Sequence, residues 1–197
     1  MKFFIVPKPS IIVLCISISL VILHPLTLAA EKQIEPIQSA IKKIDADIIF
    51  MRHANAPGFG DPNNFKIGDC STQRNLDKTG RVQAQLTGKY LRTIGLEFDE
   101  VLSSEWCRCR ETAALLDIGN WELFSGLNSF FQGHADKQET LTKLERYLSK
   151  NYNRLTLLVT HQVVIRAITD HSVGSGDLVV YNSNTQKALP IGMDGND

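Results

Sequence analysis

Two short apolar runs, far apart in the sequence, constrain the fold more than any other feature. Residues 48–51 are Ile-Ile-Phe-Met, and residues 155–159 are apolar apart from Thr156. Neither run has the apolar–polar alternation of a strand with one solvated face. Runs of this length are typical of strands buried on both faces, as in the parallel sheet of an α/β protein. The sequence therefore predicts a central sheet covered by helices on both sides.

Amphipathic helical patterns lie between these runs. Asp77 and the Asp136–Glu139 pair have the form of helix N-caps, and Ser103 or Ser104 can cap a helix from about residue 105. Alternation of buried strands with such helices predicts a three-layer α/β sandwich with a mostly parallel central sheet. We expect helices over about 77–94, 105–116, 136–148 and 162–169, further strands at 101–102, 121–124 and 178–181, a helix or linker over 31–43, and a loose tail from Asn182.

The chain has 197 residues, with 21 Lys and Arg against 21 Asp and Glu. This length predicts one domain. The balanced charge gives no basic surface for nucleic acid, so we expect no nucleic-acid partner. Oligomeric state is left open by the sequence.

The first 30 residues have the layout of a secretory signal. Lys2 and Lys8 precede an uncharged stretch over 11–23, and small residues follow at Ala29 and Ala30. The sequence predicts a signal peptide over 1–29, a domain over 30–197, and a secreted or periplasmic protein. We expect no membrane association of the mature form unless the segment stays uncleaved as an anchor.

Three cysteines remain after such a cleavage: Cys70, Cys107 and Cys109. Cys70 lies in a long Gly- and Pro-rich segment over 55–75, which is expected to be a functional loop. In an oxidising compartment we expect a disulfide from Cys70 to Cys107 or to Cys109, with the third thiol free. The competing interpretation is three buried thiols. The Cys-x-Cys spacing disfavours a zinc site.

Basic side chains follow several of the expected strands. Arg52 and His53 end one buried strand and His161 ends the other, while Arg108 lies one turn into the helix that follows residues 101–104. Ligands of open α/β sheets bind outside the carboxyl ends of the strands, so we expect these groups to converge there. Two arginines and two histidines in one pocket favour binding of a phosphoryl group.

These motifs resemble those of a known family. Arg52-His53-Ala54 resembles the Arg-His-Gly signature of the histidine phosphatase superfamily, which has the phosphoglycerate mutase-like fold. Residues 103–113 resemble its second motif, 159–161 its third, and 76–84 the start of its first helix. The matches span residues 46–181. The Cys-Arg-Cys triplet at 107–109 and the Gly-Asp-Cys loop at 68–70 resemble an uncharacterised exported branch of the superfamily.

The resemblance implies a mechanism for this chain. His53 is expected to be the nucleophile that forms a phosphohistidine, and water then hydrolyses it. Arg52, Arg108 and His161 are expected to hold the phosphoryl oxygens. Asn55 and Arg74 are further substrate-binding candidates, with loop packing as the alternative for Arg74. No metal and no cofactor are implied.

One departure from the family concerns the general acid. Residues 127–131, where family members often carry a glutamate, hold no carboxylate. The leaving group either departs without a proton, as a good leaving group can, or receives one from Asp61, Asp69, Glu105, Asp136 or Glu139. We therefore expect a metal-independent phosphohydrolase acting on a small phosphorylated substrate. The alternatives are a phosphoryl-transferring mutase and a non-catalytic phospho-ligand binding protein.

Overall fold

The computed structural model describes residues 1–2, 37–150 and 154–193. Its contacts divide the chain into Met1–Gln33 and Ile34–Asp197, and the second unit holds every element described below. Apart from Met1 and Lys2, the expected signal peptide over 1–29 lies outside the described residues, as does the first part of the expected helix or linker over 31–43.

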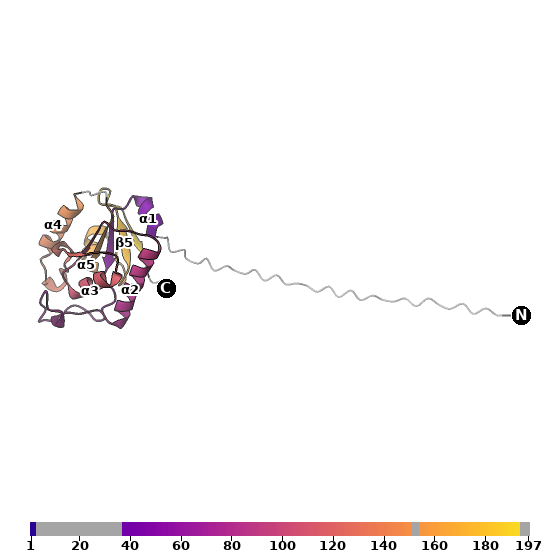
Figure 1. The fold of residues 1–197 in the computed structure, drawn as a ribbon, viewed down its shortest axis with the longest axis horizontal. Coiled ribbons are helices and arrows are strands. Elements are labelled where there is room, and N and C mark those ends of the chain that lie inside the picture. The colour runs from indigo at the N-terminus through magenta and orange to yellow at the C-terminus, as the bar shows by residue number, and fades with distance from the viewer. Residues whose placement is uncertain (3–36, 151–153, 194–197) are drawn as a thin grey trace. The chain divides into compact units, whose positions relative to one another are not determined.

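The described helices and strands alternate along most of the chain (Figure 1). Three short 3-10 helices, η1 (Cys70–Thr72), η2 (Ser125–Leu127) and η3 (Phe131–Gly133), lie in the connections. The main elements are α1 (Ile37–Ile44), β1 (Ile48–Arg52), α2 (Lys78–Thr93), β2 (Glu100–Ser103), α3 (Cys107–Leu116), β3 (Glu122–Leu123), α4 (Lys137–Leu148), β4 (Thr156–Thr160), α5 (Gln162–Thr169), β5 (Leu178–Tyr181) and β6 (Ala188–Ile191).

The strands form one six-stranded sheet in the order β3-β2-β4-β1-β5-β6. The first four are parallel, whereas β5 pairs antiparallel with both β1 and β6. β1 and β4 are neighbours, and Arg52 pairs with Thr160 at their carboxyl ends. The residues that follow, His53 and His161, therefore leave the sheet side by side.

Helices cover both faces of the sheet, which explains the apolar runs. Alternate residues of β1 belong to different cores: Ile49 and Met51 pack with α1, α2 and α3, whereas Phe50 packs with α4 and α5. Figure 1 shows α4 on the opposite side of the sheet from α1 and α2. A strand buried on both faces needs apolar residues at every position.

The tail beyond Asn182 differs from the expectation of a loose segment. Residues 188–191 form β6, which pairs with β5 as a hairpin. Asn182 shapes the turn, because its side-chain oxygen accepts the backbone N–H groups of Asn184 and Thr185. Pro190 is tolerated because β6 is the last strand of the sheet, where a missing donor breaks no ladder. The polar composition of the turn concealed the strand beyond it.

The helix starts agree with the sequence at two places and differ at a third. Asp77 caps α2 and Asp136 caps α4, each by accepting a backbone N–H. The α3 helix, however, starts at Cys107, and its N-cap Trp106 makes no side-chain cap bond. The expected caps Ser103 and Ser104 precede the N-cap: the Ser103 hydroxyl donates to the Ser104 carbonyl oxygen, and the Ser104 hydroxyl accepts the backbone N–H of Trp106 at 3.4 Å. Over the described residues, none of the helices is both long and apolar enough to cross a bilayer.

Candidate active site

The carboxyl ends of the parallel strands bring three basic side chains together. His53 follows β1, His161 follows β4, and Arg108 lies in the first turn of α3. Arg108 Nε is 3.1 Å from His53 Nε2, and Arg108 Nη2 is 3.4 Å from His161 Nδ1. Each of the three residues is only 3% exposed. The site is a buried cationic cluster whose centre is the Arg108 guanidinium.

The hydrogen bonds of His53 fix its tautomer. Its Nδ1 lies 2.8 Å from the carbonyl oxygen of Ala54, and a carbonyl can only accept, so Nδ1 carries the proton. Nε2 is then an unprotonated acceptor, in keeping with the Arg108 N–H that it faces. Burial, and after it the charge of Arg108, lowers the pKa of His53 well below its usual range. His53 is thus a neutral imidazole with the lone pair of Nε2 directed into the cluster.

His161 begins a chain of polar contacts. Since Arg108 can only donate, His161 Nδ1 accepts and Nε2 donates to the Ser104 hydroxyl, 2.9 Å away. Ser104 donates to Asn128 Oδ1 at 3.1 Å, and Asn128 Nδ2 donates to Glu105 Oε2 at 2.5 Å. Burial and then Arg108 lower the pKa of His161. The chain fixes the ring of His161 and links it to a carboxylate.

Arg52 supplies a spare donor beside the cluster. Its Nη1 donates to the carbonyl oxygen of Val173 at 2.8 Å, whereas its buried Nε has no hydrogen-bond partner. Burial lowers the pKa of Arg52, against the opposing effect of Asp177. A buried donor without a partner is costly, so an anion that accepts from it is favoured.

Asp61 holds Arg108, a contact that the sequence did not predict. The carboxylate accepts from Arg108 Nη1 at 2.8 Å and from Nη2 at 3.2 Å. The Trp106 indole and the backbone N–H of Arg74 donate to the same carboxylate. Burial on its own would raise the pKa of Asp61, but these hydrogen bonds and the Arg108 charge lower it. An ionised carboxylate cannot donate a proton, so Asp61 does not fit the role of general acid that was considered for it.

Three other acid candidates are engaged elsewhere. Asp69 accepts from the backbone and hydroxyl of Ser71, and Asp136 caps α4. The Glu139 carboxylate pairs with Lys143 at 2.7 Å. Apart from Asp61, which is bonded to Arg108, Glu105 is the candidate that is joined to the cluster, through Asn128 and Ser104. The sequence placed Ser104 at the end of a strand but did not predict that Ser104 and Asn128 link His161 to Glu105, because the partners come from different segments.

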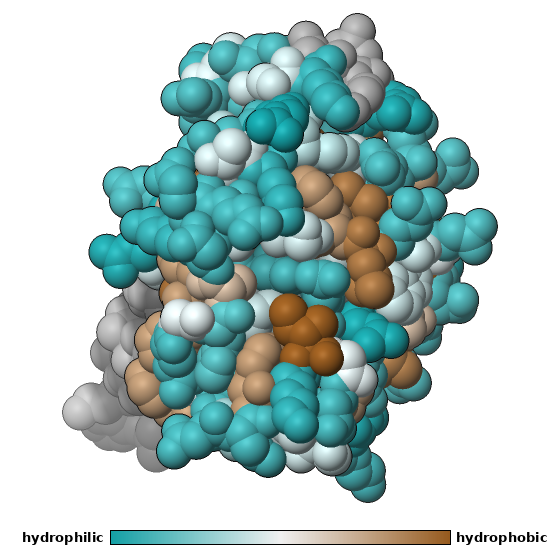
Figure 2. Space-filling view, turned by 90° about the vertical axis from the view of Figure 1, so that its left-hand side faces the viewer, coloured by the Kyte–Doolittle hydropathy of each residue, from teal (hydrophilic) through white to brown (hydrophobic). Residues whose placement is uncertain are grey.

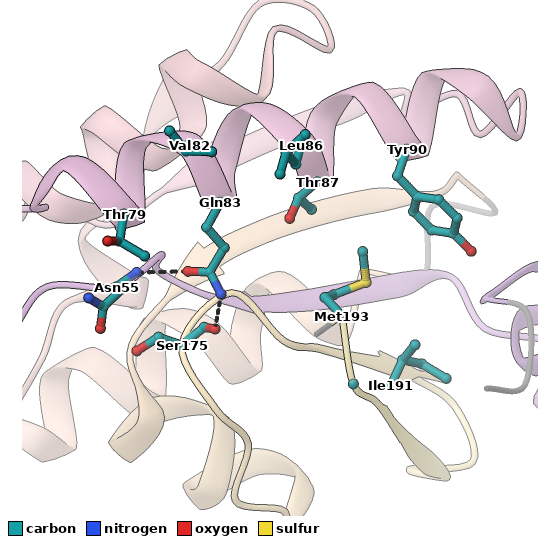
Figure 3. Close-up of a pocket in the computed structure, with 11 residues that line it drawn as sticks. Asn55, Thr79, Val82, Gln83, Leu86, Thr87, Tyr90, Ser175, Ile191 and Met193 are labelled. Carbon is teal, nitrogen blue, oxygen red and sulfur yellow. Dashed lines mark hydrogen bonds between the residues drawn. The ribbon is translucent and has the colours of Figure 1, made fainter. Parts of the chain in front are cut away.

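Two expected substrate contacts are engaged with protein groups instead. The Arg74 guanidinium donates to the carbonyl oxygens of Gly60 and Ala56, which fits the loop-packing alternative. The Asn55 side chain donates to Asp77 at 3.2 Å. Asn55 also lines one end of a hollow of about 910 Å³ along α2, where Gln83 bridges Asn55 and Ser175 (Figure 3). His53, Arg108 and His161 do not line this hollow.

The structure confirms the expected disulfide and selects Cys107 over Cys109 as the partner of Cys70. Cys70 and Cys107 are bonded, with an S–S distance of 2.06 Å, while Cys109 is a buried free thiol. The Cys109 sulfur lies 3.4 Å from His161 Nε2, and burial raises its pKa to about 12.

In the described part of the chain, no three His, Cys, Asp or Glu side chains gather in a group that could hold a metal ion.

The sequence that carries this geometry is similar to that of a known protein family. Residues 48–140, which carry the Arg52-His53 pair and Arg108, match the model of the histidine phosphatase superfamily (branch 1). The matched residues are just under half of the chain, and over them the chain is similar to members of this superfamily. His161 lies beyond the matched residues, and its position beside Arg108 comes from the structure.

Two curated relatives share parts of the sequence. A broad-specificity phosphatase of Saccharomyces cerevisiae is 31% identical over 110 residues, which is 53% of this chain and 46% of that protein. The mitochondrial serine/threonine-protein phosphatase Pgam5 of Drosophila virilis is 30% identical over 80 residues, 41% of this chain and 25% of that protein. The matches thus span about half of the yeast protein and a quarter of the fly protein.

Solved structures share the fold. A phosphoserine phosphatase from Entamoeba histolytica, in complex with 3-phosphoglyceric acid, aligns with a TM-score of 0.53 and 12% identity over 75% of this chain and 98% of that one. An open-reading-frame product of Mycobacterium tuberculosis aligns with a TM-score of 0.53 and 16% identity over 76% and 98%. These likenesses agree with the mixed, mostly parallel sheet and its helices.

Proposed function

We propose that the protein is a metal-independent phosphohydrolase that cleaves a small phosphorylated substrate through a phosphohistidine at His53. The observation that carries the proposal is the lone pair of His53 Nε2, which faces the Arg108 guanidinium in a buried cationic cluster. A neutral imidazole is the nucleophilic form, and burial keeps His53 in that form near neutral pH.

Different side chains of the cluster bind different oxygens of the phosphoryl group during transfer. An incoming phosphoryl group replaces the Arg108–His53 contact, so that its oxygens accept from Arg108 and from the unpartnered Nε of Arg52. The planar guanidinium offers parallel N–H groups to two oxygens. A phosphoryl group that arrives as a monoanion brings a proton that His161 can hold at Nδ1, because its negative charge opposes the burial and the Arg108 charge that lower the pKa of His161. His161 then donates to a third oxygen. Fixed donors of this kind stabilise the charge that spreads over the oxygens during transfer.

Phosphate release from a chromogenic aryl phosphate tests the proposal. His53→Ala removes the nucleophile, so we expect its turnover to fall by a factor of at least about a thousand, while His171→Ala, outside the cluster, behaves like the parent. Acid quenching during turnover of labelled substrate should trap phosphate on the parent and none on His53→Ala. A His53→Ala enzyme within about tenfold of the parent, a barrier change near 1.4 kcal/mol, refutes the assignment. Phosphate binding without turnover by the parent would instead favour a binding protein.

We also propose that the protein is exported and that residues 1–29 are removed, as in an exported branch of the superfamily. The Cys70–Cys107 disulfide supports this proposal, since disulfides persist mainly in oxidising compartments. The mass of the protein recovered from the producing cells checks it: a chain that starts near residue 30 is expected, and a full-length chain in a reducing compartment would contradict export.

A further inference from the structure

Two aromatic rings, Phe59 and Phe131, form an exposed pair next to the candidate active site. Phe59 is 88% exposed and Phe131 is 38% exposed. Their ring centroids lie 5.2 Å apart with the planes at 85°, an edge-to-face contact. The face shown in Figure 2 is mostly hydrophilic, and its apolar groups are small and separate. A lone exposed apolar residue is ordinary, but two rings from distant segments that meet in solvent call for an explanation.

Gln132 fixes the two segments that carry this aromatic pair. Its Oε1 accepts the backbone N–H of Asp61 at 2.7 Å, so the segment after Phe131 is bonded to the loop after Phe59. Gly60, between Phe59 and Asp61, has a φ of 70°, and a Cβ at this position would lie 2.5 Å from Gln132 Oε1. The positive φ favours glycine there, and a Cβ would displace the Gln132 amide from its contact with Asp61. The aromatic pair is thus held in place by the backbone around it.

The same loop connects the aromatic pair to the phosphate-binding cluster. The Asp61 carboxylate holds Arg108, and Arg108 Nε lies 3.1 Å from His53 Nε2. Phe59 is two residues from Asp61, and Phe131 is adjacent to Gln132. The aromatic pair is therefore carried by the same loop that holds Arg108, with Phe59 two residues along the chain from the Asp61 carboxylate.

The chemistry of the leaving group also favours a substrate with an aromatic ring. Residues 128–131 present amide, hydroxyl and aromatic groups but no carboxylate, and Asp61 is held ionised by Arg108. Glu105 is linked to His161 through Asn128 and Ser104 and makes no direct bond to the cluster. A leaving group that departs without a proton must be stable as an anion. A phenol meets this condition, since the phenolic hydroxyl of tyrosine has a pKa of only about 10.

We propose that the substrate is the phosphate monoester of a phenol, whose aromatic ring packs against Phe59 and Phe131. This proposal rests on the proposed phosphohydrolase activity. His53 Nε2 forms the bond to phosphorus, and the P–O bond breaks with its electron pair on the aryl oxygen. Water then breaks the P–N bond, which returns neutral His53 and dihydrogen phosphate. The phenol is either a small molecule or a tyrosine side chain, and both have this chemistry.

Calorimetric titration with benzylphosphonate tests ring recognition without turnover. This compound is a non-hydrolysable analogue of phenyl phosphate, and cyclohexylmethylphosphonate is its saturated counterpart. We expect the aromatic compound to bind about three- to tenfold more tightly. Phe59→Ala and Phe131→Ala should abolish the difference, while Leu86→Ala, a 60% exposed residue of α2, should keep it. Equal binding of the two compounds by the parent, or a difference that survives both Phe variants, overturns the proposal.

A second experiment measures turnover of three substrates: free phosphotyrosine, a tyrosine-phosphorylated peptide and a serine-phosphorylated peptide. A peptide preference above about tenfold in kcat/KM assigns the phenol to a protein side chain, and its absence assigns it to a small molecule. Faster turnover of the serine peptide overturns the proposal. If ring-dependent binding is found but no phosphate is released from any substrate, the phosphohydrolase function fails instead, so the two failures are distinguishable.

Discussion

At the scale of single residues, the function of Arg108 depends on Asp61. A buried guanidinium needs partners for its five N–H donors, and Asp61 supplies both carboxylate oxygens at 2.8 and 3.2 Å. The pair leaves Arg108 Nε directed at His53. The carboxylate thus sets the orientation in which Arg108 meets a phosphoryl group, and Asp61 is a positioning residue.

Asp61→Asn removes this charge and nearly preserves the side-chain volume. We expect the free energy of unfolding to fall by about 3 kcal/mol, because the buried Arg108 loses its partner. We also expect KM for a phosphate ester to rise more than kcat falls, since binding depends on the held guanidinium. Chemical denaturation and steady-state kinetics check both. Asp69→Asn, an exposed carboxylate of the same loop, is the control and should resemble the parent. Parent-like stability of Asp61→Asn would contradict the ion pair.

At the scale of elements, α3 and the loop over 55–75 form one unit. The Cys70–Cys107 disulfide joins them across 37 residues, and the Gln73 side chain accepts the backbone N–H of Cys107 at 2.9 Å. Cys107 directly precedes Arg108. The two contacts fix the start of the helix to the loop that carries Asp61, so the ion pair is assembled from two segments that are covalently joined.

Replacement of both disulfide cysteines tests this arrangement. For Cys70→Ser/Cys107→Ser we expect a loss of about 4 kcal/mol in the free energy of unfolding, the value of the chain-entropy model for a loop of this length. Turnover should also decrease, because the loop no longer holds Arg108 through Asp61. Denaturant titration and kinetics measure the two effects. Counting free thiols in unfolded, unreduced mature protein should give one, from Cys109; three would show that the disulfide is absent.

At the scale of the whole molecule, the buried cluster makes folding sensitive to acid. Burial lowers the pKa of His53 and of His161 in the folded state, whereas in the unfolded chain both return to about 6.5. Below that pH the unfolded chain binds more protons than the folded one. Stability therefore rises with pH through this range and falls as the pH drops below about 6.5.

A second acid transition comes from Asp61. Its lowered pKa contributes stability above about pH 4, which is lost as the pH falls through the folded-state pKa. We expect the denaturation midpoint to decline in two steps, first below about pH 6.5 and then below about pH 4. His53→Gln/His161→Gln should flatten the first step and leave the second. A first step that persists in this double variant would show that other groups cause it.

The sequence by itself determined the elements and the chemistry that their ends carry. An apolar run of four or five residues, without polar alternation, is typical of a strand buried on both faces, so residues 48–51 and 155–159 predicted the α/β sandwich. A histidine two residues beyond the end of each run indicated the edge of the sheet where the basic groups meet. The strand at 188–191 was missed because its turn is polar and its burial depends on β5.

Tertiary structure decided every contact between segments. No local pattern states that Asp61 holds Arg108, that Ser104 and Asn128 connect His161 to Glu105, or that Cys107 rather than Cys109 meets Cys70. Residues two apart on a helix point in different directions, and only the packing of α3 on the sheet determines which one faces the loop. The periodic pattern of apolar residues reflects local secondary structure. Contacts between distant segments depend instead on which surfaces of the helices and the sheet are buried together in the core.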